Sequence, residues 1–107
     1  MGDESFSVVV SHDAWGDISE IAEYWQARGE AWRGERYFRD LVHAARIELT
    51  DPVRARRGRR AKGSFAPEVC EILAFGVYRI IYEIDEAAAR VDILRFRQAH
   101  RDTPPLE

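Results

Sequence analysis

Cationic side chains recur along the last two strand candidates of the sequence and just beyond them. Arg79 lies in the middle of VYRIIYEI, Arg95 and Arg97 lie in RVDILRFR, and His100 and Arg101 follow. An arginine in the middle of a sheet is costly unless its side chain meets water or a partner. Guanidinium groups that converge at one end of a sheet could hold a phosphate or stabilise the charge on a phosphoryl group. These five residues therefore form the candidate target-binding site.

The same arginines also fit a structural role. On a solvated outer face of a sheet they would pair across strands with carboxylates. Acidic residues in the neighbouring strand candidates are Glu71, Glu83 and Asp92. The sequence alone leaves both interpretations of Arg79 open.

A second concentration of charge is the basic segment RARRGRRAK. Its cations are Arg54, Arg56, Arg57, Arg59, Arg60 and Lys62. The whole chain carries 16 Lys and Arg against 19 Asp and Glu, for a formal net charge of −3. The segment could grip a nucleic acid, dock an acidic protein partner, or form a solvated loop. The acidic chain would repel a phosphate backbone, and no aromatic platform interrupts the run, so nucleic acid is the least favoured of the three.

Metal and phosphate-loop chemistry find no support in the sequence. His12, His43 and His100 lie far apart, without Cys or His neighbours at the spacing of metal ligands. Gly58 and Gly63 do not open a helix after a strand, as a phosphate-binding loop requires. We therefore expect no metal and no cofactor.

Apolar periodicity divides the chain into the elements that would position these groups. The sequence predicts strands over residues 6–10, 69–75, 77–84 and 90–97, and helices over residues 12–28 and 30–49. Gly29 is the candidate C-cap of the first helix, and Pro52 ends the second. We expect residues 52–68 to form an irregular connector and residues 98–107 a flexible tail.

The order of these elements, β-α-α-β-β-β, predicts an α+β fold of two layers. The sheet is expected to be antiparallel, with the N-terminal helical hairpin packed on one face. Length predicts a single domain over residues 1–107. The sequence shows no secretory signal and no apolar window of about 18 residues, which predicts a cytoplasmic protein without a membrane partner.

The sequence resembles the RelE/ParE toxins of bacterial type II toxin–antitoxin systems over almost its whole length. LTDP is similar to the usual close of the family's second helix, and YRIIYEID followed by VDILRFRQAHRD is similar to its last strands. Two positions depart from the family pattern. Gln98 stands where many ParE-type members have histidine, and no tyrosine follows Arg101, although the RelE branch uses one there. Because the tyrosine of the RelE branch is missing, the resemblance is closer to the ParE branch.

The resemblance implies a RelE/ParE-like fold and a toxin that inhibits growth by binding DNA gyrase and is neutralised by a ParD-like cognate antitoxin. Two alternatives stay open. The chain could be a RelE-like ribosome-dependent endoribonuclease of messenger RNA, with Arg79, His100 and Arg101 as catalytic residues, or a non-toxic member that only binds its antitoxin. The resemblance also implies that the antitoxin wraps along the helices and the sheet. Trp32 and Val42 are the candidate anchors for it.

Overall fold

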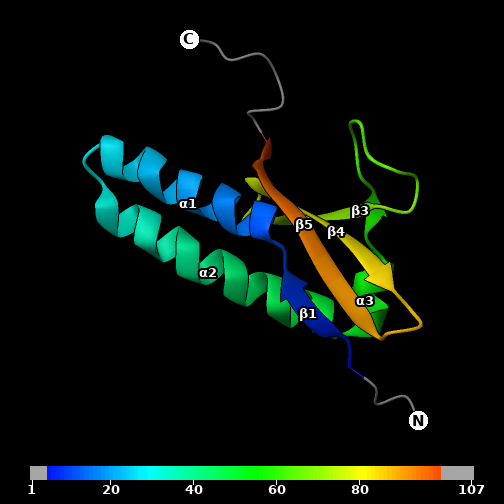
Figure 1. The fold of residues 1–107 in the computed structure, drawn as a ribbon. Coiled ribbons are helices and arrows are strands. Elements are labelled where there is room, and N and C mark those ends of the chain that lie inside the picture. The colour runs from blue at the N-terminus through cyan, green and yellow to red at the C-terminus, as the bar shows by residue number, and fades with distance from the viewer. Residues whose placement is uncertain (1–4, 100–107) are drawn as a thin grey trace.

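The computed structural model describes residues 5–99. Its elements are β1 (Ser7–Val10), α1 (His12–Ala27), α2 (Ala31–Thr50), α3 (Pro52–Arg56), β2 (Arg59–Arg60), β3 (Cys70–Ala74), β4 (Tyr78–Asp85) and β5 (Arg90–Gln98). The long helices α1 and α2 form a hairpin on one face of a five-stranded sheet, and the hairpin tip extends beyond the strands (Figure 1). This arrangement confirms the predicted α+β class with its helical hairpin on one face.

The first long helix, α1, begins and ends at residues that favour helix termini. The Ser11 hydroxyl accepts a hydrogen bond from the backbone N–H of Ala14 at 3.1 Å, which caps the start of α1. The chain leaves α1 through Gly29, whose φ of 77° lies in the left-handed region that glycine adopts without strain. Within residues 5–99, no helix combines the length and the apolar character that crossing a bilayer requires.

The sheet has the strand order β1-β5-β4-β3-β2. β3, β4 and β5 form the expected antiparallel meander, but β1 pairs with β5 in parallel, with Ser7 opposite Arg90. The expectation of a wholly antiparallel sheet was therefore wrong. A parallel pair needs a long crossover rather than a tight turn, and the chain between β1 and β5 passes through the helical hairpin and the meander.

The stretch from residue 52 to residue 68 is only in part the irregular connector that the sequence predicted, because it contains α3 and β2, while residues 61–68 form neither helix nor strand. The Asp51 carboxylate accepts a hydrogen bond from the Val53 N–H at 2.9 Å, and Pro52 occupies the first turn of the short helix α3. The two residues of β2 then pair with β3. Elements this short carry too little periodicity to be recognised from sequence.

The central strand β4 is buried on both faces. Tyr78, Ile80 and Tyr82 alternate along the strand and point into the main core under the helices. Ile81 lies on the opposite face, where Val69 packs against it in a second, smaller core. The chain between β2 and β3 therefore covers part of the sheet face that the helices leave open, and this cover encloses Arg79.

The C-terminal strand is one residue longer than predicted. Gln98 ends β5 opposite Tyr78, and the Ala99 N–H donates to the Val77 carbonyl at 2.6 Å. Residues 98 and 99 thus belong to the end of the sheet rather than to the expected tail. The rest of that tail, residues 100–107, lies outside the described residues.

Candidate functional site

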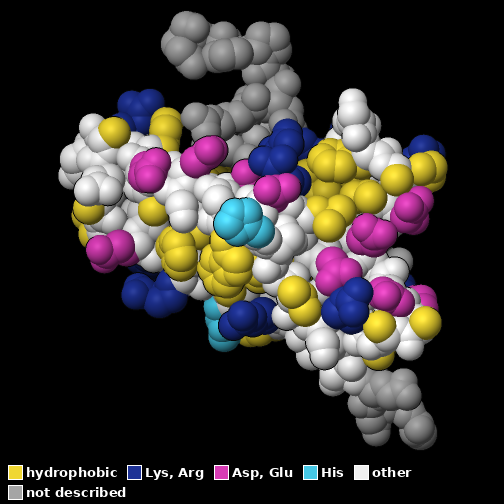
Figure 2. All heavy atoms as spheres, in the orientation of Figure 1, with side chains coloured by type: hydrophobic (Ala, Val, Ile, Leu, Met, Phe, Trp, Pro, Cys, Tyr) yellow, Lys and Arg dark blue, Asp and Glu magenta, His cyan; other side chains and the backbone are white. Residues whose placement is uncertain are grey.

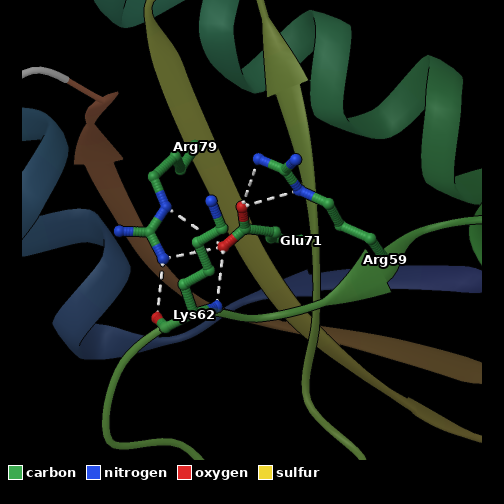
Figure 3. Close-up of polar contacts among 4 residues, drawn as sticks. All are labelled: Arg59, Lys62, Glu71 and Arg79. Atoms are coloured by element: carbon green, nitrogen blue, oxygen red, sulfur yellow. Dashed lines mark hydrogen bonds and ion pairs between the residues drawn. The ribbon is translucent and has the colours of Figure 1, made fainter.

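Arg79 occupies the middle of β4 on the face opposite the helical hairpin. Its Nε and Nη2 atoms donate to Glu71 Oε1 at 3.1 and 2.7 Å, and Nη2 also donates to the Lys62 carbonyl at 2.8 Å. The side chains of Arg79 and Glu71 are 8% and 0% exposed. Figure 3 shows the two side chains enclosed between β3, β4 and the chain that enters β3. The structure therefore gives Arg79 a buried ion pair.

Glu71 is the centre of this network rather than a simple partner of Arg79. Its second oxygen accepts from Arg59, at 3.1 Å from Nε and 2.9 Å from Nη2, while Oε1 also accepts the Lys62 N–H at 3.2 Å. Burial acts to raise the pKa of the Glu71 carboxyl, but hydrogen bonds from Arg79, Lys62 and Arg59 outweigh it, so that the net pKa is lowered. The ionised carboxylate thus joins β2 and the Lys62 backbone to β3 and β4.

Arg95 forms an ion pair with a different carboxylate, that of Asp17. Its Nε and Nη2 atoms each lie 2.8 Å from an oxygen of Asp17 in α1, a bidentate geometry. Asp17 also accepts the Phe96 N–H at 3.0 Å, and the hydrogen bond from Asp17 raises the pKa of Arg95. This interaction ties the end of β5 to the start of the helical hairpin.

The structure brings only part of the predicted arginine cluster together. Arg97 lies opposite Arg79 in the β4–β5 register, whereas the Arg95 side chain pairs with α1. Arg97 has no carboxylate within ion-pair distance in the described part of the chain. His100 and Arg101, the other two members of the predicted site, lie outside the described residues.

A polar hollow lies at this end of the sheet. Its volume is about 330 Å³, and its lining residues are Asp17, Glu20, Ile21, Arg95, Phe96, Arg97 and Gln98. Arg95, Arg97 and Gln98 were singled out from the sequence, but Asp17 and Glu20 were not, because nothing in the helical pattern of α1 indicates contact with residues about 80 positions away. Of the five residues of the predicted target-binding site, Arg95 and Arg97 line this hollow, whereas Arg79 does not.

The basic segment is partly neutralised within the fold. Three of its cations form ion pairs: Arg54 with Glu48 and Asp51, Arg56 with Glu86, and Arg59 with Glu71. The hydrogen bond from Arg56 lowers the pKa of Glu86. Three others, Arg57, Arg60 and Lys62, are exposed, and their side chains have no carboxylate partner among residues 5–99. Three of the six cations of the predicted basic segment therefore form ion pairs within the fold.

The two candidate anchors on the hairpin differ in exposure. Trp32 is 58% exposed, whereas Val42 is only 9% exposed and packs in the main core. Val42 nevertheless lines the floor of a groove between α1 and α2, beside the stacked rings of Trp15 and Phe38. The sequence interpretation assigned no surface role to these two aromatic residues, because aromatic residues at helical spacing are more often part of a core.

Residues 5–99 contain neither a candidate metal cluster nor an activated cysteine. No three His, Cys, Asp or Glu side chains of residues 5–99 are grouped so that they could hold a metal ion. Burial raises the pKa of the Cys70 thiol, which disfavours the reactive thiolate.

Comparison with known proteins places this geometry in a family. The family model that matches residues 8–103 is described as the ParE toxin of the type II toxin–antitoxin system parDE. One similar solved structure is the chromosomal ParDE system of P. aeruginosa, with a TM-score of 0.71, 16% identity, and coverage of 87% of this chain and 95% of that one. Another is the RelBE2 toxin–antitoxin complex of Mycobacterium tuberculosis, with a TM-score of 0.65, 21% identity, and coverage of 90% and 93%.

A comparison with proteins of curated function gave no match. The solved structures support the fold alone at these identities, while the family model covers nearly the whole chain. The resemblance found in the sequence is thereby confirmed, and the chain belongs to the ParE toxins of type II toxin–antitoxin systems.

Proposed function

We propose that this chain inhibits growth by binding DNA gyrase and that a cognate antitoxin neutralises it. One observation carries the choice of binding over catalysis. Arg79, the arginine that a nuclease mechanism would use, is buried and hydrogen-bonded to Glu71 and to the Lys62 carbonyl. Inhibition by binding needs a complementary surface and no reactive group.

RNA cleavage would need a group that takes the proton of the 2′-hydroxyl. The carboxylate next to Arg79 is Glu71, which is fully buried and accepts hydrogen bonds from two arginines and one backbone N–H. That environment holds the carboxylate in place and away from a substrate. The nuclease alternative would therefore depend on His100 and Arg101, which lie outside the described residues.

The proposed gyrase contact lies at the C-terminal end of β5, at the hollow lined by Arg97 and Gln98. Arg97 is the member of the predicted cluster whose side chain has no internal carboxylate within residues 5–99. The Arg97 side chain is partly exposed, and cations at the rim of an interface contribute chiefly to association rate and orientation. Arg79 and Arg95 would support this surface through the elements that they join.

The antitoxin would cover apolar side chains that the isolated chain exposes on its helices. Trp32 is 58% exposed and lies beside a hollow lined by Tyr37 and Phe75. Exposed apolar surface of this kind is typical of protein interaction sites. Val42 could contribute only as the floor of the α1–α2 groove, because its side chain is almost wholly buried.

Induction of the chain in cells, followed by assays of gyrase supercoiling and cleavage-complex formation, tests the target. We expect inhibition that weakens in Arg97→Ala and persists in the matched control Arg36→Ala, whose exposed side chain pairs with Asp40 on α2. Primer extension on cellular transcripts runs in parallel. Site-specific messenger RNA cleavage with unaffected gyrase would reject the gyrase target in favour of the nuclease alternative.

A further inference from the structure

The turn between β3 and β4 presents an exposed aromatic side chain on a strained backbone. Phe75 and Gly76 at its tip have φ values of 56° and 69°, and the Val77 N–H donates to the Ala74 carbonyl at 3.1 Å. Turns with two positive φ angles favour Asn followed by Gly, because most other side chains are strained there. Phe75 occupies the position that Asn favours and is 53% exposed. The residue thus lowers the stability of the turn without becoming buried.

Strain distinguishes Phe75 from other exposed apolar residues. Such residues occur in several groups, and Figure 2 shows some of them on one face of the molecule, so exposure alone does not identify a binding surface. A residue held in a sparsely populated conformation is more informative, because strained residues are concentrated at functional sites. Phe75 is therefore a candidate anchor in a protein interface, where aromatic side chains supply much of the binding energy.

Phe75 lies between two hollows on the outer side of α2, each with a volume of about 320 Å³. Asp40 and Phe75 line both of them, and the other lining residues include Trp32, Arg33 and Arg36 in one hollow and His43, Ile47 and Glu48 in the other. Trp32 and Ile47 are more than half exposed, and the length of helix between them is about 22 Å. We call the row of Trp32, Phe75 and Ile47, with the charged residues beside it, the α2–turn surface.

The charged residues of the α2–turn surface are separated along the helix. Arg33 and Arg36 lie in the first half of α2. Asp40 lies at its middle, and Glu48 lies near its C-terminal end. These four side chains are at least 40% exposed, and each has an ion-pair partner within the chain. Exposed pairs contribute little to stability, so these groups can exchange partners at small cost. The surface therefore presents positive charge at one end and negative charge towards the other.

A surface with opposite charges at its two ends is complementary to a second copy of itself. About a two-fold axis that passes near Asp40, two α2 helices would run antiparallel, and each patch would meet the same patch of the other copy. Arg33 of one copy would then face Glu48 of the other, and Trp32 of one copy would pack beside Ile47 of the other. The two Asp40 carboxylates, which lie nearest the axis, each keep an ion pair within their own helix.

We infer that two copies of this chain associate through the α2–turn surface about such an axis. Phe75 of each copy would pack against the hollows of the other. The association goes beyond the proposed function, because it requires neither gyrase nor an antitoxin. At Trp32 the surface overlaps with the one proposed for the antitoxin, so the two associations would exclude each other. A contact built on one helix and one turn is expected to be smaller than a standard interface of about 800 Å² per partner, so we expect a reversible dimer in the micromolar range.

Sedimentation equilibrium of the purified full-length chain, from about 1 to 200 µM, measures this association. Phe75→Asn removes the anchor and also relieves the strain of the turn. We therefore expect its dissociation constant to rise about tenfold or more, while its urea midpoint rises instead of falling. Val53→Asn is the matched control, because Val53 is more than half exposed on α3, outside the α2–turn surface. It should change the dissociation constant by less than about twofold.

Charge reversals test the antiparallel arrangement. Arg33→Glu places like charges at both ends of a two-fold dimer, and so does Glu48→Arg, so each variant alone should associate about tenfold more weakly. An equimolar mixture of the two variants restores opposite charges at both ends and should recover most of the wild-type association. Circular dichroism of each variant establishes that it remains folded.

Three outcomes would each overturn the proposed dimer. The first is a wild-type chain that stays monomeric up to about 200 µM. The second is a Phe75→Asn variant that dimerises as tightly as the wild type, and the third is a mixture of the two charge variants that associates no better than either alone. Because these measurements use the purified chain alone, such outcomes would leave gyrase binding and neutralisation by an antitoxin unaffected, and the failure of either of those functions would leave the dimer unaffected.

Discussion

Replacement of Glu71 by glutamine tests the claim that Arg79 is held by a buried ion pair. The variant Glu71→Gln keeps an acceptor for the Lys62 N–H but removes the carboxylate charge that faces the Arg79 guanidinium, whose side chain is 8% exposed. Removing one partner of a buried pair typically costs about 3–5 kcal/mol. Domains are usually stable by about 5–15 kcal/mol, so the variant should lose a large share of its stability.

Urea denaturation followed by circular dichroism measures this loss. With a slope of about 1–3 kcal/mol per molar urea, the midpoint should fall by roughly 2 M. Glu48→Gln is the matched control, because Glu48 forms an exposed pair with Arg54 at 3.4 Å and its loss should change stability by less than about 1 kcal/mol. A decrease for Glu71→Gln no larger than that of the control would refute the buried-pair interpretation.

The double variant Glu71→Gln, Arg79→Met removes the charges of both residues and so tests whether an uncompensated buried charge causes the loss of stability. Replacing both members of a buried pair is often close to neutral, so the second change should restore much of the lost stability. The stable double variant can then be tested for toxicity. Retained toxicity would show that Arg79 acts through the fold, whereas loss of toxicity in a folded protein would return it to the target-binding surface.

Acid provides an independent readout of the same pair. The folded state lowers the pKa of Glu71, so its contribution to stability is fully present above the ordinary glutamate pKa of about 4.3 and disappears as pH falls through the lower folded value. The stability difference between wild type and Glu71→Gln should be constant from neutral pH down to about pH 5 and shrink below about pH 4. A difference that stays constant in strong acid would contradict this linkage.

Four further substitutions test three other features of the fold by urea denaturation. Phe75 is 53% exposed with a φ of 56°, so Phe75→Asn should raise stability by about 1 kcal/mol, and a decrease would contradict the strain. Tyr82→Phe removes the buried hydrogen bond to the Ala55 carbonyl at 2.6 Å and should cost about 1–3 kcal/mol; no loss would mean that water replaces it. Gly58→Ala should destabilise the protein because the new Cβ would lie 1.8 Å from the Tyr82 hydroxyl. Gly16 has open space around it, so Gly16→Ala should stabilise the protein by about 0.5–1 kcal/mol. Similar effects of the two changes would contradict the close packing at Gly58.

Local patterns in the sequence determined the parts of the fold that could be predicted. The alternation of Tyr78, Ile80 and Tyr82 places their side chains on one face of β4, which the structure shows to be buried, and apolar stripes identified both long helices. Gly29 marked the end of α1 because glycine adopts a positive φ without strain, and Pro52 marked the end of α2 because proline disfavours the helical conformation of the residue before it. The parallel pairing of β1 could not be predicted in the same way, since it depends on how the chain returns after the hairpin.

The candidate site was harder to predict because its partners are distant in sequence. Glu71 was recognised as a possible partner of Arg79, eight positions away on an adjacent strand. Asp17 was not recognised as the partner of Arg95, because the two are separated by 78 positions and meet only when α1 packs beside β5. Arg39, His43 and Arg46 on α2 were overlooked for another reason, which is that charged residues on a helix usually face water. The structure shows that they line a groove together with the rings of Trp15 and Phe38.

The cations of this acidic chain fall into two groups that differ in whether the fold provides them with a carboxylate partner. Arg59, Arg79 and Arg95 are held by internal carboxylates and stabilise the contacts between elements. The exposed cations without such partners in residues 5–99 lie elsewhere, on the outer surface of α2 and around β2. A ligand that approaches these surfaces meets a local positive field, while the rest of the molecule repels it. The cations that the fold leaves without an internal carboxylate would therefore determine how an acidic partner is oriented on the surface. We expect that substitution of an internal carboxylate would reduce stability and also change where such a partner binds.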